Sequence, residues 1–238
     1  MAPDPKPTRH RNRLLRLMSA DDRALLEPHL IPLTLEERHP LEKPNRSVKS
    51  VYFIEAGIAS VVAGANGQKV EVGVIGNEGM TGQIVVMGND RSPNDCYMQV
   101  AGEGLSIPSS KLRGAMDESA TMRPLLTRYA QTFTMQATYT ALANAKGSLE
   151  ERLARWLLMA HDRIEGDELL LKHDFLSLML GVRRAGVTVA MKELASESLI
   201  QNGRARITIL DREGLEEAAN GFYGTPEAEY KRLMSGRD

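Results

Sequence analysis

Two short stretches within residues 173–197 carry apolar side chains at helical spacing, and a glycine separates them. In the first stretch, one face carries Phe175, Leu176, Met179 and Leu180. In the second stretch, the inward-facing positions are Val182, Val187, Ala190, Met191 and Leu194. Gly181 supplies the backbone freedom that a sharp turn between two helices requires. The pattern predicts a helix-turn-helix.

The opposite face of the second predicted helix is polar and basic. The residues that we expect on this face, in contact with DNA, are Arg183, Arg184, Ala185, Thr188, Val189 and Lys192. An exposed helix of this shape and charge fits the major groove of B-form DNA. The same pattern also suits an ordinary helical hairpin with a basic surface, and this alternative stays open here.

The residues that follow predict a small β-hairpin. Asn202-Gly203 is a strong turn signal between two extended runs, and Arg204 and Arg206 flank the predicted tip. A helix-turn-helix followed at once by a basic hairpin is a winged helix. We therefore add Asn202, Gly203, Arg204 and Arg206 to the predicted DNA contacts.

The pattern upstream is different. Residues 12–30 have helical spacing with a cap at Ser19, and residues 31–107 alternate short extended runs, QIVVMG among them, with turns such as Asn66-Gly67. Many short β-rich runs predict a compact antiparallel barrel or double sheet. A long helical segment is expected from about residue 109 to residue 145.

Within that segment a seam of residues repeats by four and three positions, as in a coiled coil. We predict a dimer interface from Met122, Leu126, Tyr129, Phe133, Gln136 and Thr140. A small barrel would not cover a seam of this length, so a second copy of the chain is the expected partner; the alternative is that the helix packs on the β domain. After Gly147, Ser148 and Glu151 form a capping box for the next helix.

Composition limits the possible classes of protein. Of 238 residues, 42% are hydrophobic and 26% are charged, as in an ordinary globular protein. The formal net charge is −1, so affinity for DNA must come from a local concentration of Lys and Arg. There is no apolar run of about eighteen residues and no secretory signal, so we expect a cytoplasmic protein without membrane contact.

The sequence also disfavours enzymatic and metal chemistry. Cys96 is the only cysteine, which excludes an internal disulfide and sites that need several thiolates. None of the five histidines stands at ligand spacing from another, as a metal-dependent barrel enzyme would require. A Gly-x-Ser-x-Gly motif for a nucleophilic serine is missing. No metal, cofactor or enzymatic activity is expected.

The order of these elements resembles the Crp/Fnr family of bacterial transcription regulators. In the C-terminal part the resemblance is carried by EERLARWLLMA, LMLGVRRAGVTVAMKELASESLI and GRARITILDREGLEEAA. Upstream, VYFIEAGIASVV and VEVGVIGNEGMTG look like the family's cyclic-nucleotide-binding-like domain. The resemblance extends from about residue 12 to residue 219.

The resemblance implies a homodimer that binds a pseudo-palindromic operator in double-stranded DNA and acts with RNA polymerase. Arg184 falls at the position of a base-reading arginine, and Arg183, Lys192 and the wing would hold phosphates. Ala185 and Val189 stand where the best-known members have a glutamate and a second arginine, so an altered operator is expected. A protein-interaction module that no longer binds DNA remains an alternative.

The resemblance also implies an effector pocket. Its candidate residues are Glu78, Gly79, Arg91, Ser92 and Thr138. In members that bind cyclic AMP, a Gly-Glu turn followed by an Arg-Ser pair cradles the ligand. Here Pro93 follows the pair and the preceding stretch is longer, which disfavours cyclic AMP. The effector is unidentified, and the β domain is either a sensor or purely structural. The alternative to an effector site is a turn in which Arg91 makes a local salt bridge with Glu78 or Asp90.

These predictions divide an α+β chain into five segments. They are a flexible tail at 1–11, a cyclic-nucleotide-binding-like sensor domain at 12–121, a dimerisation helix at 122–147, a winged helix-turn-helix domain at 148–220 and a C-terminal tail at 221–238.

Overall fold

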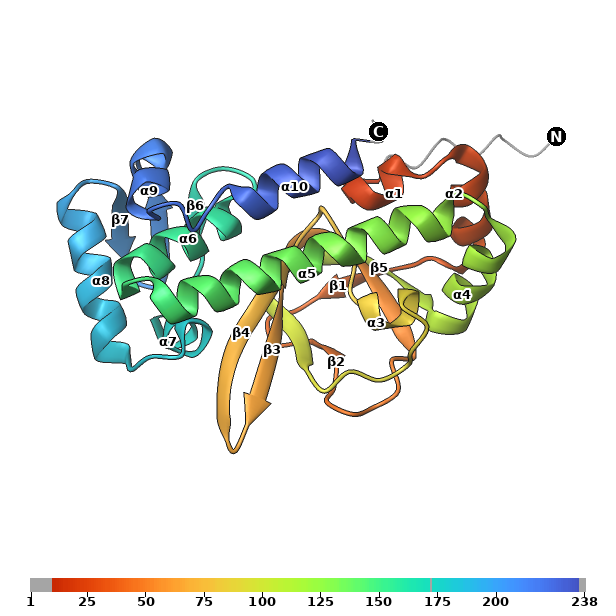
Figure 1. Ribbon diagram of the computed structural model, residues 1–238, viewed down its shortest axis with the longest axis horizontal. Coiled ribbons are helices and arrows are strands. Elements are labelled where there is room, and N and C mark those ends of the chain that lie inside the picture. Colours follow the sequence, from red (N-terminus) through yellow and green to blue (C-terminus); the bar gives the residue numbers. More distant parts are fainter. Residues whose placement is uncertain (1–9, 172, 236–238) are drawn as a thin grey trace.

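Helix α5 (Met122–Lys146) runs along the molecule and connects a β-rich domain with a smaller C-terminal domain (Figure 1). The architecture is that of a computed structural model, which describes residues 10–171 and 173–235. Most of the predicted N-terminal tail lies outside these ranges. The predicted α+β class, with an antiparallel sheet first and a helix-turn-helix last, is confirmed.

Two short helices, α1 (Arg13–Leu17) and α2 (Ala20–Leu26), and the 3₁₀ turn η1 (Glu27–His29) precede the sheet. Asn12 caps α1, and its buried amide donates to the backbone carbonyls of Ile54 and Gly79 at 2.8 and 2.7 Å. These two bonds fasten α1 to the β domain. Ser19 and Asp22 form a capping box for α2, which confirms the predicted cap.

The β domain contains one antiparallel sheet in the order β1-β5-β3-β4, with β2 also paired to β5. Its strands are β1 (Ile31–Leu35), β2 (Pro40–Glu42), β3 (Ser50–Ala65), β4 (Gln68–Ile75) and β5 (Asp95–Pro108). Bulges along the β3–β5 pairing bend both long strands. Asn66 and Gly67 form the β3–β4 turn with φ of +52° and +78°, as the Asn-Gly signal predicts.

One predicted extended run is a helix instead. Within QIVVMG, residues Gln83–Val86 form α3. Gly82, at φ +74°, turns the chain into the left-handed region just before this run. The adjacent residues Val85 and Val86 are then both buried against the same apolar cluster, whereas neighbouring residues of a strand point to opposite faces.

The predicted long helical segment is interrupted. It forms α4 (Ser109–Glu118) and then α5, with Ser119 in an extended conformation between them. The hydroxyl of Ser119 donates to Asp22, and that of Thr121 donates to the same carboxylate at 2.8 Å, so α2 holds the break in place. Neither α5 nor any other helix in the described part of the chain is long and apolar enough to cross a membrane.

The predicted dimer seam on α5 is mostly covered within the protomer. Met122 and Leu126 are fully buried in the β domain core, and the Tyr129 hydroxyl donates to the carbonyl of Met80 at 2.9 Å. The Gln136 amide accepts from the Val74 N–H at 2.6 Å and donates to the same residue's carbonyl at 3.2 Å.

The two remaining seam residues are also engaged by the protomer. Phe133 packs against the apolar cluster of the sheet, and the Thr140 hydroxyl donates to the Gln136 carbonyl. Four of the six residues, Met122, Leu126, Tyr129 and Gln136, are buried within the protomer and face the β domain. Phe133 and Thr140 are half-buried, so for these two the dimer contact stays a prediction. A four–three repeat marks an apolar helix face, but it does not say which surface covers that face.

The C-terminal domain begins with α6 (Leu149–His161), whose predicted Ser148–Glu151 capping box is confirmed. The other elements are β6 (Glu168–Leu169), α7 (His173–Leu180), α8 (Arg184–Ser196), β7 (Ile200–Gly203), β8 (Arg206–Ile209) and α9 (Arg212–Ala218). The three strands pair in the order β6-β8-β7. One apolar cluster joins α6, α7, α8 and α9 with the strands, and it also includes Ile58 and Val74 of the β domain, so the core continues across the domain junction.

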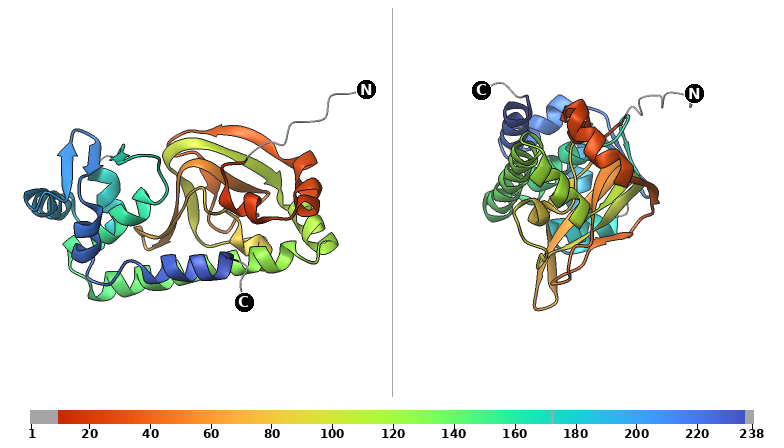
Figure 2. Two further views of the ribbon diagram at one scale, coloured as in Figure 1. Left: turned by 90° about the horizontal axis from the view of Figure 1, so that it is seen from above. Right: turned by 90° about the vertical axis from the view of Figure 1, so that its right-hand side faces the viewer.

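Helix α10 (Thr225–Met234) occupies the segment for which the sequence predicted only a C-terminal tail. It lies alongside α5, as the left view of Figure 2 shows. The Tyr230 hydroxyl donates to the Glu78 carbonyl at 2.8 Å, and Met234 is buried in the β domain core. The last helix of the chain therefore returns from the C-terminal domain to the β domain.

Candidate nucleic-acid interface

Helices α7 and α8 meet at the predicted turn. Gly181 adopts φ +63°, in the left-handed region that glycine favours, and the Val182 N–H donates to the Ser177 carbonyl at 3.0 Å. Val182 lies in this turn, so its assignment to the second helix was wrong: α8 begins at Arg184. The other predicted inward positions of both helices are buried.

The predicted outer face of α8 is exposed. Arg183 caps the helix and is exposed, as are Arg184, Ala185 and Lys192. Val189 is 53% exposed on the same face. Thr188 is half-buried and its hydroxyl donates to the Arg184 carbonyl at 3.0 Å. Helix α8 lies at the end of the molecule remote from the β domain (Figure 1).

The hairpin after α8 is present, but its turn lies two residues later than predicted. Asn202 and Gly203 belong to β7, and the turn consists of Arg204 and Ala205, with φ +57° at Ala205. Burial explains the register, because this pairing sets Ile200 opposite Ile209 and buries both.

The cationic side chains of the hairpin are placed differently from one another. Arg204 is exposed at the tip, whereas Arg206 forms an ion pair with Glu168 of β6 at 3.0 Å. Asn202 and Gly203 are exposed on β7. Arg204 is therefore the better placed of the two arginines to meet a phosphate.

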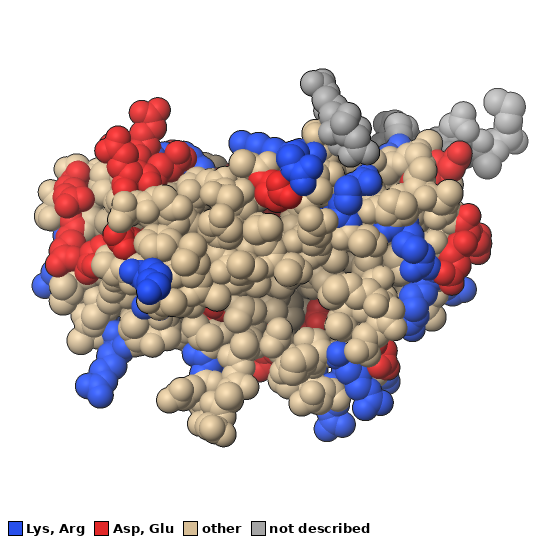
Figure 3. Space-filling model, viewed as in Figure 1, with Lys and Arg blue, Asp and Glu red and all other residues tan. Residues whose placement is uncertain are grey.

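The side of the domain formed by α9 is acidic. Glu213, Glu216 and Glu217 are all exposed there, and Figure 3 shows acidic side chains gathered over this part of the molecule. Negative charge at this position repels phosphates. A nucleic acid duplex is therefore expected to approach α8 and the hairpin rather than α9.

A buried polar contact joins the β3–β4 hairpin to the helix-turn-helix domain. The Glu71 carboxylate accepts from the Trp156 indole N–H of α6 at 2.6 Å and from the Ser60 hydroxyl at 2.5 Å. The Ser60 hydroxyl also lies 3.5 Å from the Met179 sulfur of α7. Burial raises the pKa of Glu71 to about 7. The β domain thus contacts both helices that support α8.

The candidate effector residues do not form one site. Glu78 is buried and paired with Arg163 at 2.8 Å, and Gly79 lies against the Tyr129 ring. Arg91 is exposed and its backbone forms an isolated β-bridge with Ser47, while its side chain pairs with Asp90 at 3.6 Å. This local pair is one of the alternatives that the sequence left open.

The other two candidates are equally separate. The Ser92 hydroxyl accepts from the Asn94 N–H, and Thr138 is exposed on α5, where its hydroxyl donates to the Thr134 carbonyl. The contacts within the protomer do not join these five residues into one pocket, and the effector site stays a prediction. Its residues were aligned on short motifs, and the loop between Glu78 and Arg91 forms a helix that the motif did not anticipate.

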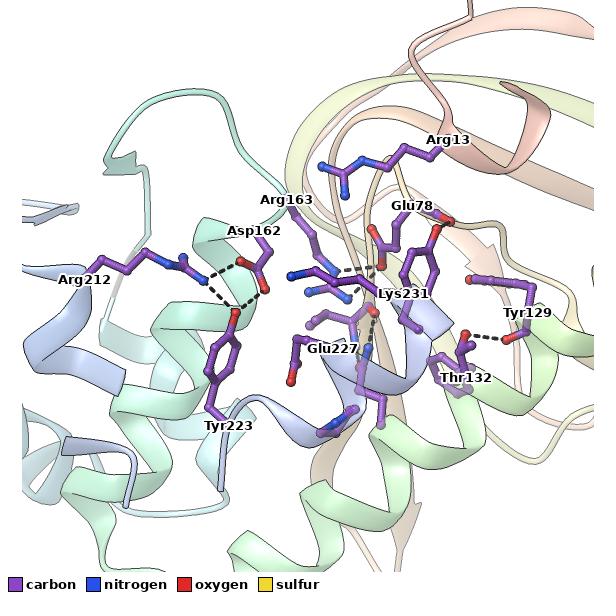
Figure 4. Close-up of a pocket in the computed structure, with 15 residues that line it drawn as sticks. Arg13, Glu78, Tyr129, Thr132, Asp162, Arg163, Arg212, Tyr223, Glu227 and Lys231 are labelled. Atoms are coloured by element: carbon purple, nitrogen blue, oxygen red, sulfur yellow. Dashed lines mark hydrogen bonds and ion pairs between the residues drawn. The ribbon is translucent and has the colours of Figure 1, made fainter. Parts of the chain in front are cut away.

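A cavity of about 230 Å³ lies instead where the β domain, α5, the end of α6 and α10 meet (Figure 4). Of the five candidates only Glu78 lines it. The sequence reasoning missed Arg163, Arg212 and Lys231, which also line it. The signal that could have indicated α10 is the segment from Gly224, with Pro226 in its first turn and apolar residues at helical spacing. In the described ranges no group of His, Cys, Asp and Glu side chains could hold a metal ion.

Comparisons with known proteins agree with this architecture. Residues 151–218 match the family model of the Crp-like helix-turn-helix domain. A transcriptional regulator of the Crp/Fnr family from Eubacterium rectale has a TM-score of 0.68 at 18% identity, over 87% of this chain and 98% of that chain. FixK2 from Bradyrhizobium japonicum has a TM-score of 0.66 at 14% identity, over 79% and 96%. A Crp/Fnr-family regulator from Thermus thermophilus has a TM-score of 0.64 at 19% identity, over 80% and 99%. No curated protein sequence matches the chain significantly.

Proposed function

We propose that this chain is a transcription regulator of the Crp/Fnr family and that it binds operator DNA as a homodimer through α8 and the wing. The match of residues 151–218 to the Crp-like helix-turn-helix domain and the shared fold support this proposal. It is a DNA-binding regulator rather than an enzyme. We infer that it works in the cytoplasm and contacts RNA polymerase at promoters, as the family resemblance implies. The observation that supports the proposal most is the exposed basic face of α8 at the end of the molecule.

Each cationic side chain of this surface has a proposed role. Arg184, in the first turn of α8, reads a guanine through two hydrogen bonds, which is worth about 1–3 kcal/mol of discrimination. Arg183, Lys192 and Arg204 hold phosphates and position the helix.

The remaining exposed side chains of α8 affect base preference. Ala185 and Val189 offer only apolar contact, for example to a thymine methyl group. The operator should therefore differ from that of family members with charged residues at these positions.

We propose that the dimer forms through the outer face of α5. Thr127, Gln131, Thr134, Thr138 and Leu142 are exposed along it, and none is charged. Leu142 is 45% exposed. Helix α5 runs across the face that Figure 3 shows, and the middle of that face is a broad uncharged surface. A helix of 25 residues is roughly 37 Å long, so a second copy can pack along it and present a second α8 about one turn of DNA away.

Selection of bound sequences from a random pool of duplex DNA tests the proposal. We expect a pseudo-palindrome whose half-sites lie about one helical turn apart. Arg184→Ala should weaken binding to the selected site about 10- to 100-fold and relax the choice at one base. Arg204→Ala should weaken binding to all sequences alike and lower the salt dependence of the affinity by about one phosphate contact.

The control variant is Lys111→Ala, which removes an exposed cation from α4 in the β domain and should leave DNA affinity unchanged. If the wild-type protein enriches no sequence and its affinity for duplex DNA does not fall with salt, the DNA-binding proposal is refuted. That result would favour a protein-interaction module.

A further inference from the structure

The cavity at the domain junction contains more cationic than anionic side chains. Its acidic side chains are Glu78, Asp162 and Glu227, and its basic side chains are Arg13, Arg163, Arg212 and Lys231. They come from both domains and from α10, and Figure 4 shows them around one space. The fully ionised lining therefore carries one excess positive charge.

Two of the three carboxylates form ion pairs within the protein, and the third accepts a backbone N–H. Glu78 pairs with Arg163 at 2.8 Å, and this buried pair joins the β domain to the segment just beyond α6. Asp162 pairs with Arg212 at 2.8 Å and accepts the Tyr223 hydroxyl. The Glu227 carboxylate accepts a hydrogen bond from the Gly224 N–H at 2.8 Å, at the start of α10.

Two cations of the lining are left over. Neither Arg13 of α1 nor Lys231 of α10 has an ion pair with a carboxylate among the residues that the structure describes. Both are exposed at the rim, whereas the Arg163 side chain is only 8% exposed and lies deeper. In Figure 4 Arg13 reaches toward Arg163 from the β domain, and Lys231 extends into the same space from α10. Arg13, Lys231 and Arg163 thus surround a cavity in which Glu227 is the only lining carboxylate without an ion pair among the described residues, so one net positive charge remains.

The rest of the wall suits an organic molecule. Phe133, Val74 and Pro226 contribute apolar surface to the lining, and tyrosine side chains contribute aromatic surface. A volume of about 230 Å³ lies below the roughly 300 Å³ at which pockets for drug-sized ligands begin. The cavity therefore selects a molecule smaller than a dinucleotide, with a negative group at one end and a short carbon skeleton.

We propose that this cavity binds a small organic anion, a phosphate ester or a carboxylate, between Arg13, Lys231 and Arg163. Such a ligand would neutralise the excess charge and join α1, α10 and Arg163, which lies two residues beyond the end of α6. The segments that contain α6 and α10 lie on either side of α8 in the chain. An anion bound between these segments and α1 therefore favours one orientation of the DNA-binding domain relative to the β domain. Only this last consequence rests on the proposed function; anion binding itself does not.

Thermal unfolding of the full-length protein at constant ionic strength tests the site. The probes are inorganic phosphate, glycerol 2-phosphate and succinate, each compared with chloride. A ligand that binds the native state raises the midpoint with its concentration. We expect at least one organic probe to raise the midpoint more than inorganic phosphate does, and the comparison of the two organic probes distinguishes a phosphate ester from a carboxylate.

The decisive variant is Arg13→Gln/Lys231→Gln, which removes the two unpaired cations and no ion pair within the described chain. Its affinity for the probe, measured by isothermal titration calorimetry, should be at least about tenfold weaker than that of the wild type, which is the loss expected for a charge-assisted contact. The matched control is Lys43→Gln/Lys111→Gln, which removes two exposed cations that do not line the cavity and should bind the probe like the wild type.

A separate measurement of DNA affinity distinguishes the two proposals. A probe that binds, with affinity lost in the first double variant and kept in the control, supports the anion site even if the protein fails to bind DNA. A protein that binds DNA but raises its midpoint with none of the probes overturns the anion site alone. Equal weakening in both double variants also overturns it, because the binding would then depend on general charge.

Discussion

The buried carboxyl group of Glu71 predicts an unusual dependence of stability on pH. Glu71 is 3% exposed and lies between the sheet and α6, where the Trp156 indole and the Ser60 hydroxyl donate to it. Burial raises its pKa from 4.5 to about 7. Since the pKa is higher in the folded state than in the unfolded state, the folded state binds the proton more tightly.

The sign and the size of the effect follow from linkage. The stabilising contribution of Glu71 is complete below pH 4.5 and is lost as the pH rises through 7. The folded-state pKa lies roughly 2.5 above the unfolded-state value, and each unit is worth about 1.4 kcal/mol, so the free energy of unfolding should fall by up to about 3–4 kcal/mol. The variant Glu71→Gln retains a neutral side chain of similar shape at every pH, so this part of the pH dependence should disappear.

Urea denaturation between pH 5 and pH 8 measures the effect, with fluorescence of Trp156, the only tryptophan, and circular dichroism as independent probes. The wild type should lose stability relative to Glu71→Gln across this range. The control Glu118→Gln changes an exposed carboxylate at the end of α4 and should differ from the wild type by a constant amount. A difference between wild type and Glu71→Gln that stays constant with pH would refute the argument from burial.

Two further predictions concern packing. A Cβ atom at Gly79 would lie 2.0 Å from the Tyr129 hydroxyl oxygen, so Gly79→Ala should lower the free energy of unfolding by about 1–3 kcal/mol. The matched variant Gly114→Ala, in open space within α4, should raise the free energy of unfolding by about 0.5–1 kcal/mol. Urea denaturation measures both, and equal effects of the two variants would contradict the geometry. Leu142→Glu should convert the proposed dimer to a monomer in size-exclusion chromatography with light scattering, while Leu17→Glu, at a similarly exposed leucine of α1, should not. A Leu142→Glu variant that is still dimeric would contradict the proposed interface.

The sequence alone determined the features that depend on neighbours only a few residues away. The caps at Ser19 and Ser148 and the turn at Asn66 each need one side chain and the adjacent backbone, and all three are present as predicted. The helix-turn-helix is equally local, because Gly181 and two apolar helix faces specify it. The exposed basic face of α8 follows from the same pattern, as the polar complement of a buried face.

The tertiary structure decided everything that depends on which surface meets which. The seam around Tyr129 and Gln136 has the repeat of a coiled coil, but the sheet and α10 cover it, so the face left for a partner is the uncharged one around Thr138. The register of the wing depended on burying Ile209 rather than on its Asn-Gly signal. The cavity exists because residues as distant in sequence as Arg13 and Lys231 converge, and no local pattern records a convergence of side chains across two domains.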